Sequence, residues 1–366
     1  MTDKTILFIG SYKDESFDGQ SLKTKTYLKL FNEEGVKYIF VNTANWKKRF
    51  IKIYFEISKN IKKCDVIFLM VSFRGARSLI PLINKMNRKR KRFIYSMVGT
   101  GPLALHIRSI GWKKGNDFVL KHEYGQFEDS KMEKELSKLD LILPETDIIT
   151  DLYSDFYHLK NCKTMTNFRI IDSSLLYENK KDISDKNIHL LYLSRLVAEK
   201  GIFDLINAVN NLNSKGYHFV LDIFGQNYFS DEENKRFQSL LKNNQDILYK
   251  GTVSFEEVIP LMQKYDVFCF PTICPQEGTP GVVVEALISG TPILSSRFPQ
   301  SANLLTERSD SLIFDFGDES DLERKLEMLN NSQLLETITL GARNSGKRFL
   351  YENNKETLFK YIFGVE

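Results

Sequence analysis

The sequence is poor in cysteine and lacks any long apolar run. Only four cysteines occur among 366 residues, and no two of them have CxxC spacing. This usage is typical of reduced thiols and disfavours a disulfide framework or a zinc centre. No apolar run reaches the roughly 18 residues that a membrane-spanning helix needs, and no signal-peptide pattern opens the chain. These features predict a cytoplasmic protein, and the lack of an Asp-x-Asp motif is consistent with metal-independent chemistry.

The remaining composition is that of a globular protein, with 42% hydrophobic and 27% charged residues. A chain of 366 residues is too long for one ordinary hydrophobic core. We therefore expect two domains.

The net charge of +4 conceals a strong asymmetry along the chain. Residues 1–170 hold 31 Lys and Arg against 19 Asp and Glu, whereas the remainder holds 20 against 28. Within residues 41–100 the count is 15 against 2. The first half is therefore expected to meet an anionic partner, which is a membrane surface, a nucleic acid or a phosphorylated acceptor.

Short apolar runs alternate with amphipathic stretches along the whole chain. The runs expected to be strands are Thr5–Gly10, Val36–Asn42, Asp65–Ser72, Arg92–Val98, Leu139–Pro144, Ile188–Leu196, His218–Gly225, Ile247–Val253, Asp266–Pro271, Thr291–Ser296 and Ser311–Phe316. The intervening helical patterns include Leu22–Glu34, Ile202–Leu212, Phe255–Tyr265 and Asp321–Leu329. Continuous apolar strands with helical crossovers predict parallel sheets that are covered on both faces.

The polar stretch Asp172–Asn187 is the best boundary between two such series. It predicts an N-terminal domain over residues 1–170 and a C-terminal domain over residues 171–346. Two doubly wound domains of this kind would face a central cleft, because ligands bind at the carboxyl ends of parallel strands.

Glu277 and Glu285, with seven residues between them, occupy the most informative segment. Thr279 is expected to cap a helix that has Pro280 at its first position and ends at Gly290. Glu277 then lies in a loop at a strand end, and Glu285 lies inside the helix. The free backbone N–H groups at the helix start suit an anion such as a phosphate.

Several segments of the second half together resemble a retaining glycosyltransferase of the GT-B fold, similar to glycosyltransferase family 4 of the bacterial surface-polysaccharide type. The first match is the paired-glutamate segment with its Pro, Glu-Gly, Pro, Glu-Ala and Gly-Thr-Pro pattern. The second is Ser194-Arg195-Leu-Val-Ala-Glu-Lys200-Gly201, and the third comprises Ile223-Phe-Gly225 and Tyr249-Lys-Gly251-Thr-Val253. The resemblance is dense over residues 188–296 and thin before residue 165.

The resemblance implies a role for each matching residue. Arg195 and Lys200 would hold the donor pyrophosphate, Glu285 the ribose hydroxyls and Glu277 the hydroxyls of the donor sugar. Arg195, Lys200 and Glu277 are therefore the candidate catalytic residues. The remaining donor-binding candidates are Gly225, Gly251, Thr252, Val253, Gly278, Thr279, Pro280, Gly281 and Val282.

In the first half the resemblance is carried by fewer residues. Gly19 resembles the glycine of the family's loop after the first strand, which implies that it is a further donor-binding residue near the phosphates. Thr166-Asn167-Phe168 resembles the segment that leads into the second domain. The final residues, from about 347 to 366, resemble the closing helices that return to the first domain. Candidates on the acceptor side are Gly99, Gly101, His106 and His122.

Two other readings of the chain stay open. The segment Gly99-Thr-Gly101-Pro-Leu-Ala104 follows a predicted strand and matches the dinucleotide fingerprint, which would indicate a nicotinamide-dependent oxidoreductase. The basic first half would also suit a nucleic-acid-binding protein, although aromatic residues interleaved on a known module are missing.

The stretch Trp46–Lys63 is a basic helical pattern whose apolar residues recur at Trp46, Phe50, Ile53, Ile57 and Ile61. It is either a crossover helix that covers its sheet or a helix in a membrane interface. Both interpretations are compatible if one face of the helix contacts the sheet and another face contacts the membrane. The basic residues expected at an anionic membrane are Lys47, Lys48, Arg49, Arg88, Lys89, Arg90, Lys91 and Arg92, together with Trp46.

The resemblance therefore implies a metal-independent enzyme without a cofactor. It would transfer a sugar from a nucleotide-sugar, most naturally a UDP-sugar, to a hydroxyl of a lipid-linked or polysaccharide acceptor. We expect it in the cytoplasm, peripheral at the inner face of the cell membrane.

Overall fold

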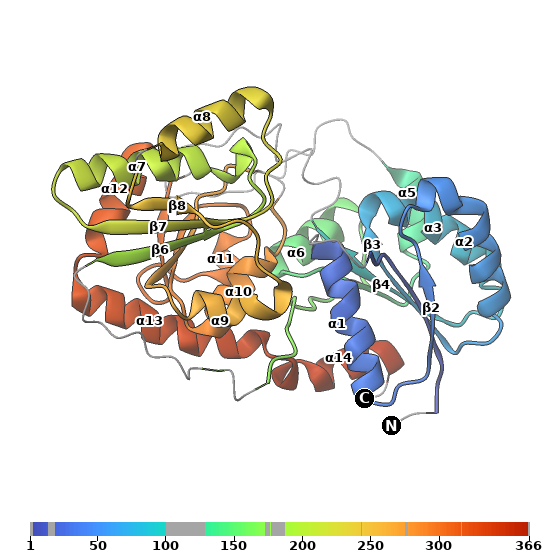
Figure 1. Cartoon of the computed structure of the whole chain (residues 1–366). Helices are drawn as coiled ribbons and strands as arrows, with labels where there is room; N and C mark the ends of the chain where they lie inside the picture. The colour runs from blue at the N-terminus through green and yellow to red at the C-terminus, as the bar shows by residue number, and fades with distance from the viewer. Residues whose placement is uncertain are drawn as a thin grey trace. The chain divides into compact units, whose positions relative to one another are not determined.

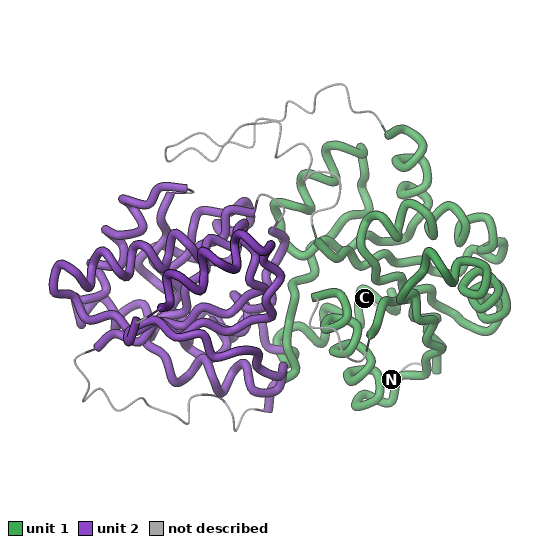
Figure 2. The backbone as a smooth tube through the Cα atoms, turned by 45° about the horizontal axis from the view of Figure 1, so that its top comes forward, with its two compact units in different colours: residues 1–111, 120–170, 351–366 green, residues 112–119, 171–350 purple. Residues whose placement is uncertain are grey.

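The computed structural model describes residues 3–13, 19–99, 129–172, 176, 187–242, 244–274, 277–315 and 317–364. The chain divides into two compact units (Figure 2). Unit 1 contains the described residues up to Ile170 together with those from Tyr351 onward, and unit 2 runs from Ile171 to Leu350.

Unit 1 is built on a parallel sheet with strand order β2-β1-β3-β4-β5. Its strands are β1 (Ile6–Gly10), β2 (Tyr38–Asn42), β3 (Val66–Ser72), β4 (Arg92–Val98) and β5 (Leu141–Leu143). Its helices are α1 (Gly19–Glu33), α2 (Trp46–Asn60), α3 (Phe73–Met86), α5 (Ser130–Leu136), α6 (Asp147–Phe156) and α14 (Lys355–Phe363), with a short 3-10 turn η5 (Tyr351–Asn353).

The helices of unit 1 cover both faces of this sheet (Figure 1). Side chains of α2, α3, α5 and α6 pack on one face, where Ile53, Ile57 and Ile61 are among the buried residues. Side chains of α1 and α14 pack on the other face, around Phe8 and Phe68. This two-sided burial explains why the strands are continuously apolar rather than alternating.

Unit 2 has a six-stranded parallel sheet with strand order β11-β10-β9-β6-β7-β8. Its strands are β6 (Ile188–Leu193), β7 (Phe219–Phe224), β8 (Ile247–Tyr249), β9 (Val267–Phe270), β10 (Ile293–Ser296) and β11 (Ser311–Phe314). Its helices are α7 (Ile202–Ser214), α8 (Asp231–Leu241), α9 (Val258–Met262), α10 (Gly281–Ser289), α11 (Ser301–Leu304), α12 (Glu319–Met328) and α13 (Ser332–Gly346), with 3-10 turns η2 (Ala198–Lys200), η3 (Phe255–Glu257) and η4 (Lys347–Phe349).

Both units are therefore Rossmann-like α/β domains, as the alternation of apolar runs predicts. Each of the eleven predicted strands is present and lies within its predicted range. In each sheet the strand order reverses once, between β1 and β3 in unit 1 and between β6 and β9 in unit 2. Ligands of open α/β sheets bind at such switch points, outside the carboxyl ends of the strands.

The C-terminal helix α14 belongs to unit 1, where it lies beside α1 (Figure 1). The Lys355 Nζ atom lies 2.5 Å from Glu34 Oε1, and the Tyr351 hydroxyl donates to the same oxygen over 2.9 Å. The hydrogen bond from Lys355 lowers the pKa of Glu34, and the hydrogen bond from Tyr351 acts in the same direction. A carboxyl whose pKa is lowered by folding stabilises the fold above its unfolded pKa and loses that contribution as the pH falls through its folded pKa.

We therefore expect Glu34→Gln to lower the free energy of unfolding at pH 7 by about 1 kcal/mol or less, since Lys355 is partly exposed. The difference from the wild type should shrink as the pH falls below about 4, where the unfolded carboxyl is itself protonated. Urea unfolding across this pH range measures it. Glu33→Gln is the matched control, because Glu33 pairs with Lys29 at an exposed position. Equal losses in both variants would contradict this role of Glu34.

No helix in the part of the chain that the structure describes is long and apolar enough to cross a bilayer.

Candidate donor site in unit 2

The candidate residues of unit 2 gather at the carboxyl ends of two neighbouring strands. β6 and β9 pair in parallel, with Leu190 opposite Val267, and they flank the switch point of the sheet. Arg195 follows the end of β6, and Glu277 lies in the loop between β9 and α10. The chain thus brings the two sequence motifs to the one edge where such sheets bind ligands.

The loop after β6 is packed directly against the loop after β9. The backbone N–H of Ile273 donates to the Glu199 carbonyl over 2.9 Å. Gly201 has φ +73°, and a Cβ atom built on it would lie 1.8 Å from the carbonyl oxygen of Pro271. Glycine is required here both for the left-handed backbone and for the close approach of the two chains. The preceding residue, Lys200, is thereby held over the end of β9.

Replacing Gly201 by alanine is therefore expected to lower the free energy of unfolding by about 3 kcal/mol or more, from backbone strain and the forced shift of Pro271. Gly216→Ala is the matched control in the same unit. Gly216 also has a positive φ, of +94°, but open space surrounds its Cβ position. Only the dihedral cost of roughly 1 kcal/mol applies there. Chemical denaturation of both variants tests the contrast, and equal losses would show that the contact with Pro271 is unimportant.

Lys200 and Glu277 form a buried ion pair at the centre of the site. The Lys200 Nζ atom donates to Glu277 Oε1, and each side chain is about 10% exposed. The hydroxyl of Thr272 donates to the same oxygen over 2.9 Å. Ser296, at the end of β10, in turn donates its hydroxyl to the Thr272 carbonyl over 2.5 Å. Three adjacent strand ends therefore fix the position of one carboxylate.

This arrangement refines the sequence-based roles of the two residues. Lys200 and Glu277 were expected to contact different parts of a donor, and in the structure they contact each other. An ammonium group has three donor hydrogens, so Lys200 can keep its bond to Glu277 and still donate to a phosphate oxygen. The negative charge of Glu277 also reaches the neighbouring strand, because it adds to the effect of burial in raising the pKa of Tyr192.

Arg195 differs from Lys200 in being exposed. Among the residues that the structure describes, no carboxylate forms an ion pair with it. Its loop is nevertheless held in place, because the backbone N–H of Leu196 donates to the Gln226 carbonyl over 2.9 Å and that of Tyr228 donates to the Leu196 carbonyl over 3.0 Å. A guanidinium group on a fixed backbone at a strand end is suited to binding an anionic oxygen pair.

Helix α10 begins one residue later than the sequence suggested. Its N-cap is Pro280 and its first residue is Gly281, so the prediction that Thr279 caps the helix is wrong. Proline at the cap supplies an extended backbone, with ψ 123°, and its carbonyl accepts from Val283 and Val284. The predicted stop is confirmed, since Gly290 ends the helix with φ +76°. Gly281 and Val282 then form the first turn, and Glu285 lies buried inside the helix.

The remaining donor-side candidates lie on the β7 and β8 edge of the sheet. Gly225 is buried with φ +145°, and its N–H donates to the Gly251 carbonyl over 2.7 Å. The Tyr249 hydroxyl donates to the Gly225 carbonyl over 2.9 Å. Thr252 is exposed and Val253 is half-buried. The structure thus couples Gly225 with Gly251, and it leaves Thr252 open to solvent.

The candidates of the first half belong to unit 1. Gly19 is the exposed first residue of α1, and Gly99 follows β4 with φ +77°. Gly101, His106 and His122 lie outside the described residues. Gly99 lies beyond the switch point between β1 and β3, whereas a dinucleotide fingerprint belongs to the first strand of its sheet.

Two polar residues of the site were missed from the sequence. Thr272 is completely buried and holds Glu277, and Ser296 is completely buried and holds Thr272. In the sequence, each of them is only a small hydroxyl residue at the end of a predicted strand, and Thr272 directly follows Pro271. Such residues are common at strand ends, so position alone does not distinguish them.

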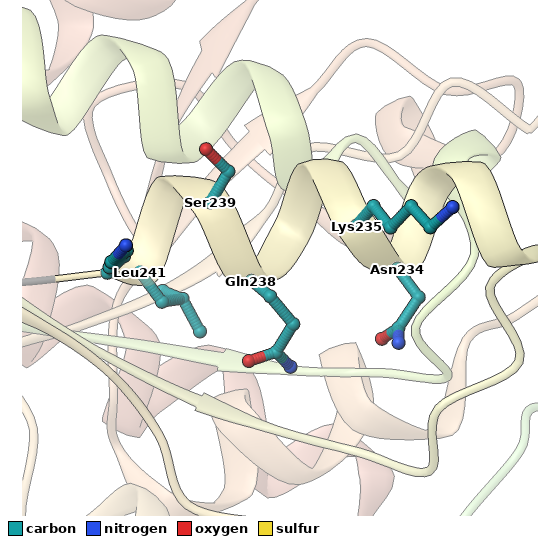
Figure 3. Close-up of a pocket in the computed structure, with 6 residues that line it drawn as sticks. Asn234, Lys235, Gln238, Ser239 and Leu241 are labelled. Carbon is teal, nitrogen blue, oxygen red and sulfur yellow. The ribbon is translucent and has the colours of Figure 1, made fainter.

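A separate shallow hollow lies on α8 (Figure 3), lined by Asn234, Lys235, Gln238, Ser239, Leu241 and Lys242. None of the candidate residues lines it. Among the described residues, no three His, Cys, Asp or Glu side chains are grouped closely enough to hold a metal ion.

Residues 175–344 match the sequence profile of the family described as glycosyl transferases group 1. The matched segment makes up most of unit 2, so this unit is similar to the group 1 glycosyl transferases. The match spans both loops that build the site, from Arg195 through Glu285.

The chain is also similar to known proteins in sequence and in structure. A capsular polysaccharide biosynthesis glycosyltransferase, CapM of Staphylococcus aureus, is 26% identical over 169 residues, which cover 46% of this chain and 43% of CapM. A 41.2 kDa protein from the cps region of Klebsiella pneumoniae is 20% identical over 298 residues, which cover 77% of this chain and 74% of that protein. The chain thus spans less than half the length of CapM.

The crystal structure of HepE from Anabaena in complex with UDP and glucose matches with a TM-score of 0.70 at 13% identity, covering 99% of this chain and 100% of that chain. The neighbours of this kind are GT-B glycosyltransferases, and the likeness confirms the predicted fold class of two Rossmann-like domains.

Proposed function

We propose that the protein is a retaining glycosyltransferase that moves a sugar from a nucleotide-sugar, most naturally a UDP-sugar, to an acceptor hydroxyl. The observation that carries the proposal is the Lys200–Glu277 pair at the switch point of a domain that matches the group 1 glycosyl transferase profile. A cation for phosphate and a carboxylate for sugar hydroxyls lie side by side, next to the start of α10. In a nucleotide-sugar the diphosphate is joined directly to the sugar. Such a donor would therefore place its diphosphate at Lys200 and its sugar hydroxyls at Glu277.

In this mechanism Arg195 and Lys200 stabilise the negative charge that develops on the leaving nucleotide diphosphate. Fixed cations perform this task without a metal ion, and neither a metal nor another cofactor is part of the proposal. The first turn of α10, with Gly281 and Val282, would offer its positive dipole end to the same charge.

Glu277 orients the donor sugar by accepting hydrogen bonds from its hydroxyls, and Glu285 accepts from the ribose. The proposed mechanism uses no covalent nucleophile, and the nucleotide departs from the face that the acceptor attacks. The released phosphate then assists deprotonation of the acceptor hydroxyl, which gives retention of anomeric configuration.

The UDP preference rests on the likeness to HepE, whose crystal structure contains UDP and glucose. The acceptor class rests on the sequence relationship to CapM and on the cps-region protein. We propose a lipid-linked or growing polysaccharide acceptor, presented by the basic unit 1 at an anionic membrane surface. The protein would then be cytoplasmic and peripheral at the inner face of the cell membrane.

The decisive experiment measures binding and slow donor hydrolysis across a panel of nucleotide-sugars, with the released nucleotide as the readout. We expect at least one UDP-sugar to be bound and slowly hydrolysed without added metal. Binding of a nicotinamide dinucleotide, with no nucleotide-sugar bound, would replace the proposal by the oxidoreductase reading of the Gly99 loop.

A further inference from the structure

Helix α2 carries two distinct apolar faces. The inner face consists of Ile53 and Ile57, which are buried in the core of unit 1, with Ile61 just beyond the helix end. This face accounts for the helical spacing seen in the sequence, so the crossover-helix reading is correct for it. A second set of apolar side chains points away from the core, and it includes Phe50, which the helical spacing predicts for the inner face.

The second set is exposed to a degree that is unusual for such side chains. Ile51 is 73% exposed and Phe55 is 65% exposed, and Phe50 and Tyr54 beside them are also exposed. Half of the large exposed hydrophobic side chains in the described part of the chain thus fall within six consecutive residues. Neighbouring apolar residues of this kind mark a contact surface rather than ordinary surface scatter.

Lysines flank these side chains along the same side of the helix. Lys48, Lys52, Phe55 and Lys59 follow one another at intervals of three or four residues, so they line one stripe. We call Lys48, Ile51, Lys52, Phe55 and Lys59 the α2 outer face. The only carboxylate on α2 is Glu56, which is 3.9 Å from Lys52.

The basic loop after α3 adjoins the end of this helix. Lys91 donates from its Nζ atom to the carbonyl oxygens of Lys62 and Cys64, just beyond α2. Arg92 is also engaged, since its guanidinium donates to the Tyr361 carbonyl over 2.9 Å. Lys91 and Arg92 are among the residues expected at a membrane, but their side chains form hydrogen bonds within unit 1. Arg88, Lys89 and Arg90 are exposed, and they extend the positive charge of α2.

We infer that the α2 outer face inserts Ile51 and Phe55 into the interface of an anionic lipid bilayer. The inference rests on the membrane contact proposed above and names the side chains that enter the lipid. Charge complementarity selects the occupant, because apolar side chains among lysines match acyl chains beneath anionic headgroups. A second copy would bring like charges together on the same face, which opposes self-association.

The test is co-sedimentation of the full chain with lipid vesicles. We expect binding to vesicles that contain phosphatidylglycerol and much weaker binding to pure phosphatidylcholine. Ile51→Ser combined with Phe55→Ser should weaken binding roughly tenfold or more. Lys48→Gln and Lys59→Gln should each weaken it roughly fivefold, and the effect should diminish in high salt. A Phe55→Trp variant should show a blue-shifted emission that lipids brominated along the acyl chain quench.

Leu340→Ser is the matched control, because Leu340 is 59% exposed on α13 of unit 2. It should leave vesicle binding unchanged. Slow donor hydrolysis should be unchanged in every α2 variant, which separates this inference from the proposed transferase activity.

Vesicle binding could disappear in high salt and yet be unchanged by the Ile51 and Phe55 substitutions. That result would overturn insertion into the bilayer, and it would support a purely electrostatic membrane contact. Absence of vesicle binding would overturn both, without touching the donor site. A dimer that Phe55→Ser dissociates, or tighter binding of a nucleic-acid oligomer to the same face, would assign the face to another occupant and overturn the inference.

Discussion

Replacing Lys200 by methionine is expected to lower turnover by roughly 10²–10³-fold while the protein stays folded. The methionine retains the buried stem but removes the cation that neutralises the leaving diphosphate. It also leaves the Glu277 carboxylate without its ion-pair partner, beside a donor that is itself anionic. Weaker donor binding should therefore accompany the loss of turnover. Steady-state kinetics with the accepted nucleotide-sugar give both quantities.

The ion pair between Lys200 and Glu277 can be tested further with a double variant. Adding Glu277→Gln to Lys200→Met removes the unpaired carboxylate, so donor binding should partly recover while turnover does not. The coupling between the two substitutions then measures the pair directly. Independent, additive effects on donor binding would show that the two side chains act separately.

Lys325→Met is the matched control for Lys200→Met. Lys325 is about 9% exposed and pairs with Glu307 over 2.5 Å in the same unit, but it lies on α12 rather than at the candidate site. Each variant loses an ion pair that a buried lysine makes, and both should be less stable. Only the Lys200 variant should lose turnover per folded molecule. Equal kinetic losses would mean that Lys200 acts through the stability of the domain.

Much of this fold follows from the sequence, because continuous apolar strands separated by helices have few arrangements. The pattern predicts every strand of both sheets, and it places Glu277 and Arg195 at strand ends. Predicted helix boundaries are less accurate, as α10 shows. Its first residue depends on whether Thr279 or Pro280 takes the extended conformation, and both residues are acceptable before a helix.

Side-chain partners across the sheet cannot be predicted in this way. Lys200 and Glu277 are 77 positions apart, and their contact exists only because β6 and β9 are neighbours in a sheet whose strand order reverses between them. Sequence spacing likewise identified most of the inner face of α2, since Ile53, Ile57 and Ile61 are buried, but it wrongly included Phe50, which is exposed. It gave no sign that Ile51 and Phe55 are exposed, because exposure depends on what the rest of unit 1 leaves uncovered.

Two substitutions of Glu277 are expected to distinguish an orienting role of this carboxylate from a role as general base. Glu277→Gln keeps an oxygen that accepts from Thr272 but removes the negative charge. Glu277→Ala removes both. If the carboxylate orients the donor sugar, the alanine variant should lose roughly 10²–10³-fold in turnover and the glutamine variant clearly less. The shape of the pH–rate profile should be the same in the glutamine variant as in the wild type, because no proton passes through this side chain.

Thr272→Val extends the argument to the residue that holds the carboxylate. It removes the 2.9 Å hydrogen bond to Glu277 with little change in volume, so turnover should fall by roughly tenfold with donor binding nearly unchanged. Glu307→Gln, which disturbs the control pair of Lys325, should leave turnover unaffected. Loss of one limb of the pH–rate profile in Glu277→Gln, with activity as low as in Glu277→Ala, would instead make Glu277 a general base.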